Sequence, residues 1–115
     1  MATLVTIVQL NNALRLGLDI DDLVDTARVD DATLKLEQAE DIVLDFIHTT
    51  AAAEEWDDTN VPGRVSAAII LTVKCLLDDT PEAAAMLSGL SGTIPVDARN
   101  PIAALLWRLR KPSLA

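Results

Sequence analysis

The chain is poor in the residues that cross-link small folds or perform catalysis. Its 115 residues include one cysteine, one histidine and no tyrosine, and aromatic residues make up only 3%. A single cysteine excludes an internal disulfide and suits a reducing compartment. Only four glycines are present, and 50% of the residues are hydrophobic, mainly alanine, leucine, valine and isoleucine. This composition argues against a turn-rich sheet and predicts one all-α domain over residues 1–115, a small bundle of four to five helices.

No stretch of the sequence has the length of a membrane span or the pattern of a signal peptide. The longest apolar stretch, residues 65–73, ends at Lys74 and is far shorter than the roughly 20 residues of a spanning helix. The N-terminal residues lack a basic region and a cleavage site. We therefore expect a soluble protein made inside the cell, without a membrane partner.

Motifs for catalysis and cofactor binding are missing as well. Neither glycine-rich phosphate-binding motif, GxGxxG or GxxxxGK[ST], occurs in the chain. Pairs of adjacent carboxylates are frequent: Asp21/Asp22, Asp30/Asp31, Glu54/Glu55, Asp57/Asp58 and Asp78/Asp79. They lie near expected helix ends and loops and lack the spacing of an EF-hand, so we expect capping or solvated roles for them.

His48 and Cys75 are the only imidazole and the only thiol of the chain. A zinc site needs further nitrogen or sulfur ligands. A nucleophilic Cys–His pair needs an activated thiol, whereas Cys75 lies in an apolar run, where a buried, inert thiol is expected. We predict no enzymatic activity, no metal and no cofactor.

Helical periodicity in the first half of the chain predicts two main helices. Thr6 and Gln9 have the spacing of a capping box at the start of the first. Asp30 or Asp31 would cap a longer amphipathic helix that runs to about Thr49.

The second half predicts three more helices, one of which is apolar around almost its whole circumference. The apolar helix begins at Val61 and Pro62 and runs to about Leu77. Such a helix belongs either in the centre of a bundle or at a contact between subunits. A short helix follows from Thr80–Pro81 to Leu87. The candidate residues for subunit contacts are Trp56, Arg64, Ile69 and Ile70.

The closing residues 100–115 form the third of these helices, with an unusual apolar and cationic end. Asn100 caps it, Pro101 suits its first turn, and Pro112 stops it. Tryptophan and arginine are the residues most often found at binding hot spots. The segment therefore has two possible roles, docking on another protein or packing back onto its own bundle. The candidate docking residues are Ile102, Leu105, Leu106, Trp107, Arg108, Leu109, Arg110, Lys111 and Leu114.

Charge is distributed unevenly along the chain, whose net charge is −9. Residues 1–60 contain 14 acidic and 3 basic residues, whereas residues 61–115 contain 4 acidic and 6 basic residues. The plain interpretation is a solvated acidic surface; the alternative is association of copies, acidic face to basic end. A pI of about 4.3 opposes the attraction to phosphates that supplies most non-specific affinity for DNA, so direct DNA binding is not expected.

The order of these segments resembles the small head–tail connector proteins, also called head-completion or adaptor proteins, of tailed bacteriophages and prophages. The likeness spans most of the chain, and the Val-Pro helix with the closing LLxRxRxP segment is its most specific part. The residues that carry it are Leu4–Thr6, Leu14–Arg15, Asp30–Asp31, Ala39, Trp56, Val61–Pro62, Ala68–Leu71, Asn100–Pro101, Leu105–Leu106, Arg108, Arg110 and Pro112–Ala115.

The resemblance implies a non-enzymatic virion protein at the head–tail junction, present in the host cytoplasm during assembly. Its copies would form a ring, twelvefold in the virion, beneath the portal protein, with a tail-completion or head-closure protein on the other side. DNA would pass through the ring without specific binding, and the C-terminal segment would engage the portal. The alternative is a small cytoplasmic interaction module, such as a regulator or an antitoxin-like dimer.

Overall fold

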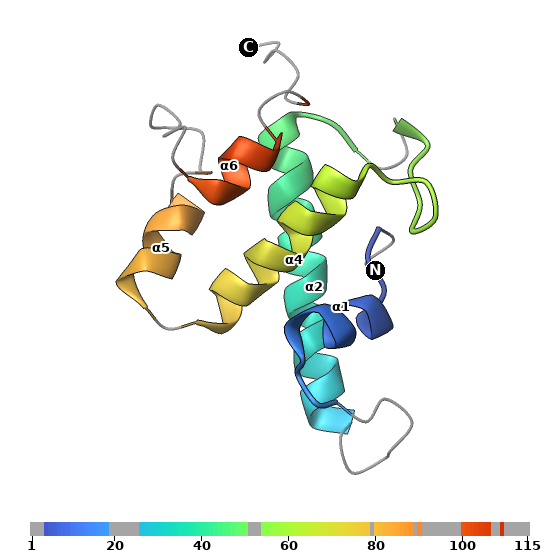
Figure 1. Cartoon of the computed structure of the whole chain (residues 1–115), viewed down its shortest axis with the longest axis vertical. Coiled ribbons are helices and arrows are strands. Elements are labelled where there is room, and N and C mark those ends of the chain that lie inside the picture. The colour runs from blue at the N-terminus through green and yellow to red at the C-terminus, as the bar shows by residue number, and fades with distance from the viewer. Residues whose placement is uncertain are drawn as a thin grey trace.

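The described part of the chain is an all-α bundle, which confirms the predicted fold class (Figure 1). The computed structural model describes residues 4–18, 26–50, 54–78, 80–88, 90, 100–106 and 109. Its helices are α1 (Ile7–Leu14), α2 (Thr26–Ile47), α4 (Gly63–Leu77), α5 (Pro81–Ser88) and α6 (Pro101–Leu106). Among these residues, no helix is both long and apolar enough to cross a membrane.

Helix α4 lies at the centre of the bundle. It crosses the long helix α2 and also packs against α1, α5 and α6 (Figure 1). Its side chains Val65, Ala68, Ile69 and Val73 are completely buried. A helix with neighbours on several sides needs apolar residues around its circumference. The sequence predicted either the bundle centre or a subunit contact for this helix, and in the structure it lies at the bundle centre.

Helix α1 begins with the predicted capping box. The Thr6 hydroxyl accepts a hydrogen bond from the Gln9 backbone N–H at 3.1 Å, and the Gln9 side chain accepts one from the Thr6 N–H at 2.9 Å. The helix ends at Leu14, and its C-cap Arg15 has a left-handed backbone conformation with φ 53°. That position usually favours glycine, because a side chain crowds the left-handed backbone.

Helix α2 begins four residues before the first predicted cap, Asp30. Its first residue is Thr26, so Asp30 and Asp31 lie inside the helix and the predicted cap is wrong. The Asp31 carboxylate instead accepts a hydrogen bond from the Lys35 ammonium group at 2.8 Å, one turn later. Such a pair favours helix continuation. The helix ends at Ile47, and His48 takes a left-handed conformation with φ 59°.

The starts of α5 and α6 agree with the sequence. The Thr80 hydroxyl accepts from the Ala83 N–H at 3.2 Å. The Asn100 side-chain oxygen accepts from the Ile102 N–H at 3.0 Å, and its amide donates to the Met86 carbonyl at 2.8 Å. Asn100 therefore caps α6 and also ties its first turn to α5.

Candidate docking surfaces

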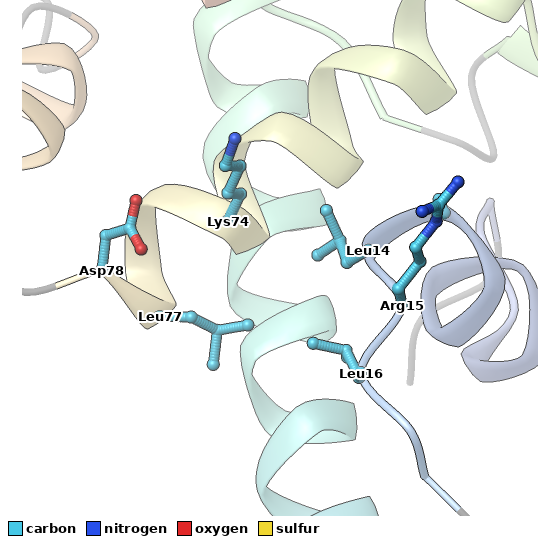
Figure 2. Close-up of a pocket in the computed structure, with 7 residues that line it drawn as sticks. Leu14, Arg15, Leu16, Lys74, Leu77 and Asp78 are labelled. Atoms are coloured by element: carbon cyan, nitrogen blue, oxygen red, sulfur yellow. The ribbon is translucent and has the colours of Figure 1, made fainter.

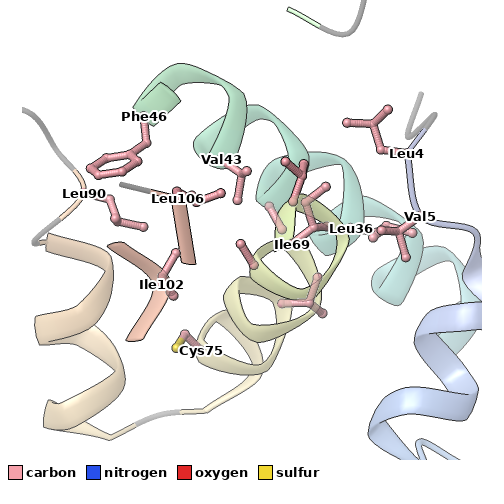
Figure 3. Close-up of a cluster of buried hydrophobic side chains, with 14 of the residues drawn as sticks. Leu4, Val5, Leu36, Val43, Phe46, Ile69, Cys75, Leu90, Ile102 and Leu106 are labelled. Carbon is pink, nitrogen blue, oxygen red and sulfur yellow. The ribbon is translucent and has the colours of Figure 1, made fainter. Parts of the chain in front are cut away.

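Helix α6 is part of the protein's own core. Ile102 and Leu106 have no exposed surface, and they lie beside Val43, Phe46 and Leu90 (Figure 3). The prediction that these two residues dock on a partner is therefore wrong, because their side chains already pack within the bundle. The first turns of this segment therefore have the other predicted role, which is packing back onto their own bundle.

The rest of the predicted docking set falls into two groups. Leu105 and Leu109 are half-buried and pack against the core. The other members lie outside the residues whose side chains are described: Trp107, Arg108, Arg110, Lys111 and Leu114. These five residues, together with the outer surfaces of Leu105 and Leu109, are what is left of the predicted docking segment.

The four predicted subunit-contact residues differ in accessibility. Ile69 is completely buried in the core, so its assignment to a subunit contact is wrong. Trp56 and Ile70 are half-buried and pack against the core, and Ile70 also lines a cavity of about 190 Å³ beside Val61. Arg64 is exposed on the first turn of α4. Of the four, only Arg64 is exposed.

The thiol and the imidazole are not arranged as reactive groups. Cys75 is 3% exposed, and burial raises the pKa of its thiol, with the nearby Asp78 carboxylate adding to the increase. Both effects disfavour the thiolate, which is the nucleophilic form. His48 is exposed at the end of α2. Within the described ranges, no group of three or more histidine, cysteine, aspartate or glutamate side chains is placed to hold a metal ion.

Asp57 organises the turn that leads into α4. Its carboxylate accepts hydrogen bonds from the backbone N–H and hydroxyl of Thr59 and from the Asn60 N–H. The Asn60 side chain in turn accepts from the Asp57 N–H at 2.7 Å and donates to the Glu55 carbonyl at 2.9 Å. These donors stabilise the charged form, so the Thr59 and Asn60 bonds lower the pKa of Asp57. One carboxylate of the Asp57/Asp58 pair thus has a turn-forming role.

We expect Asp57→Asn to flatten the acid dependence of stability. A carboxylate with a lowered pKa stabilises the folded state fully above its unfolded-state pKa of about 4, and this contribution is lost as the pH falls through the lower folded-state value. Urea unfolding followed by circular dichroism should separate the variant from the wild type at pH 7 and bring them together in acid. The exposed Asp58→Asn is the matched charge control and should keep the wild-type acid dependence. Parallel curves for wild type and Asp57→Asn at every pH would rule out this role.

The outer face of α2 is acidic and has an exposed leucine at its centre. Four exposed residues follow one another along α2 at spacings of four, seven and four positions: Asp30, Leu34, Asp41 and Asp45. These spacings place them on one side of the helix. Leu34 keeps 52% of its surface exposed. The opposite side of the helix is buried against α1 and α4. We call this surface the acidic face and define it by Asp30, Leu34, Gln38, Asp41 and Asp45.

A cleft of about 380 Å³ lies between the ends of α1 and α4 (Figure 2). The side chains of Leu14, Leu16 and Leu77 point toward one another across it, and Leu77 is 40% exposed. Arg15 and Lys74 are exposed at its rim, and among the described residues neither is paired with a carboxylate. The Asp78 carboxylate lies on the α4 side of the cleft, across from Arg15 (Figure 2). The cleft is lined by Ala13, Leu14, Arg15, Leu16, Lys74, Leu77 and Asp78.

Hydrogen bonds hold the α1 wall of the cleft in place. The Asn11 side chain donates to the Leu18 carbonyl at 3.1 Å and accepts from the Leu18 N–H at 3.0 Å. The Arg28 guanidinium donates to the Leu16 carbonyl at 3.0 Å, which connects this wall to α2. The cleft could not be predicted from the sequence, because it depends on where α1 ends and on which residue of α4 lies opposite.

No known protein family, no curated protein and no solved structure was found to match the chain.

Proposed function

We propose that the chain is a structural adaptor of a tailed bacteriophage or prophage. Its copies assemble as a ring beneath the portal, connect the head to the tail and continue the DNA channel. In this proposal the protein has no enzymatic role. It is made in the host cytoplasm and acts at the head–tail junction of the virion.

The observation that carries this proposal is the fixed base of the closing segment. Ile102 and Leu106 are completely buried, so α6 is anchored in the core of the protomer. In the sequence, Trp107 follows this anchor directly and is itself followed by Arg108, Arg110 and Lys111. A segment that starts from a rigid base and carries tryptophan and arginine suits a lasting contact with a partner. The base would transmit force from the portal to the bundle.

Charge supports the second part of the proposal, passage of DNA through the ring. The chain has a net charge of −9, and its described helices include an exposed acidic face on α2. Basic surfaces hold DNA by its phosphates, and the attraction is strong at low salt. An acidic ring lets a duplex pass without holding it.

Sedimentation velocity of the chain at increasing concentration distinguishes the adaptor from an interaction module. The adaptor should be a monomer that forms a ladder of oligomers, or a ring, as the concentration rises. A fixed dimer over the whole range would contradict the proposal and favour the regulator or antitoxin-like alternative. The α1 variant Val8→Ala, which changes an exposed residue away from the closing segment, serves as the control for nonspecific association.

A further inference from the structure

We propose that the cleft between α1 and α4 binds the acidic face of α2 from a second copy of this chain. The inference rests on the proposed function, because it names the surfaces through which neighbours in the ring would meet. Its basis is that one protomer carries both a cleft with cations at its rim and an exposed leucine flanked by carboxylates.

The first argument is charge complementarity. Arg15 and Lys74 place two positive charges at the rim of the cleft, against one negative charge from Asp78, in a chain that is otherwise strongly acidic. The acidic face has the reverse arrangement, an exposed Leu34 with Asp30 and Asp41 on either side. An apolar side chain would enter the cleft while carboxylates meet the cations at its rim. Such matching suppresses wrong partners and sets the orientation of binding.

The second argument is the conformation of Arg15. Its φ of 53° is left-handed, which favours glycine at this position. The chain nevertheless has an arginine there, with an exposed side chain that pairs with no carboxylate among the described residues. An arginine in a backbone conformation that favours glycine has a conformational cost, and residues with such a cost often lie at binding sites.

The third argument is geometry. The cleft is built by α1 and α4, which cover the buried side of α2, whereas the acidic face is the opposite side of the same helix. Two complementary patches on opposite sides of a protomer join copies head to tail. Such a contact leaves a free cleft at one end and a free face at the other, so copies keep adding; they form a ring where the rotation between neighbours closes and an open filament where it does not.

The contact between two isolated copies is expected to be weak. One helix face in a shallow cleft buries less than the roughly 800 Å² per partner of a standard stable interface. In a closed ring each copy is held by a contact on each of two sides, so the binding free energies of the contacts reinforce one another. The test must therefore trap brief encounters.

Disulfide trapping between engineered cysteines provides this test. A chain carrying Leu34→Cys and Leu77→Cys should give, on mild oxidation, a ladder of cross-linked oligomers that disappears under reduction. The matched control is Val8→Cys with Leu34→Cys, because Val8 is 51% exposed on α1 but does not line the cleft. The native Cys75 is buried and stays in both chains. We expect at least tenfold more cross-linked product from the first chain, and less of it at high salt.

Charge reversal then identifies the surfaces. Chains with Leu77→Cys and a reversed cleft, Arg15→Glu with Lys74→Glu, should fail to cross-link to Leu34→Cys chains of normal charge. Adding Asp30→Lys and Asp41→Lys to the Leu34→Cys partner should restore the cross-linked heterodimer. All four charge positions are exposed, so these variants should keep the wild-type circular dichroism spectrum. The milder pair Lys74→Glu and Asp41→Lys repeats the test if the double reversals do not fold.

Equal ladders from the Val8 and Leu77 chains, or no restoration by the second reversal, would overturn the proposed contact. Binding to portal rings is measured separately, since it depends on residues 107–115, which none of these substitutions changes. Failure of the cross-link with intact portal binding overturns the cleft contact alone. A charge-dependent cross-link without portal binding overturns the adaptor function and supports the head-to-tail contact.

Discussion

Replacing Ile69 with alanine should lower the free energy of unfolding by roughly 2–5 kcal/mol. The side chain is completely buried on α4, the helix that contacts α1, α2, α5 and α6. Removing its methyl and methylene groups loses their burial and leaves a cavity that the surrounding helices fill only in part. Since domains of this size are stable by only about 5–15 kcal/mol, the melting temperature should fall by about 8–20 °C. Thermal unfolding followed by circular dichroism measures the change.

Two neighbouring substitutions test whether burial is the cause. Ile70→Ala changes the adjacent residue, which is half-buried, and should cost clearly less. Leu34→Ala, at a position that is 52% exposed, should leave the melting temperature nearly unchanged. If Ile69→Ala melted like the wild type but associated less with other copies, Ile69 would be a subunit contact after all.

Deleting residues 107–115 should leave a folded helical protein that no longer binds portal rings. The deletion removes the tryptophan and all three cations of the closing segment but keeps Ile102 and Leu106, the core residues of α6. Trp107→Ala alone should cost about 2 kcal/mol of binding free energy, a loss of about 30-fold in affinity. The whole deletion should exceed that loss. Surface plasmon resonance on immobilised portal rings measures both variants.

The stability of the truncated chain separates docking from packing. Leu109 is half-buried against the core, so its removal should cause a modest fall in melting temperature. Val8→Ala, at an exposed apolar position on α1, is the binding control and should keep the wild-type affinity. Loss of the cooperative melt in the truncated chain would show instead that residues 107–115 complete the core.

Helix starts defined by local side-chain bonds could be predicted from the sequence. Thr6 with Gln9, Thr80 and Asn100 each cap the helix that their spacing indicated, because a cap depends on residues within one turn. The start of α2 could not be predicted in this way. Two adjacent aspartates suit a cap, but they also suit the interior of a helix when Lys35 follows Asp31 at the next turn.

The sequence predicted that a helix exists more readily than it predicted what covers each side of that helix. Periodicity showed that Ile102 and Leu106 share one side of a helix, but an apolar side looks the same whether its own core or a partner covers it. The cleft was not predicted at all. It joins Leu14 and Leu16 to Leu77, residues about sixty positions apart, and depends on a left-handed Arg15 that sequence patterns do not favour.

Native mass spectrometry of portal rings mixed with this chain tests the adaptor function most directly. The rings should gain mass in steps of one chain, up to one copy for each portal subunit, and the chain lacking residues 107–115 should add none. Portal rings that keep their own mass at saturating concentrations of the full chain would contradict the adaptor function.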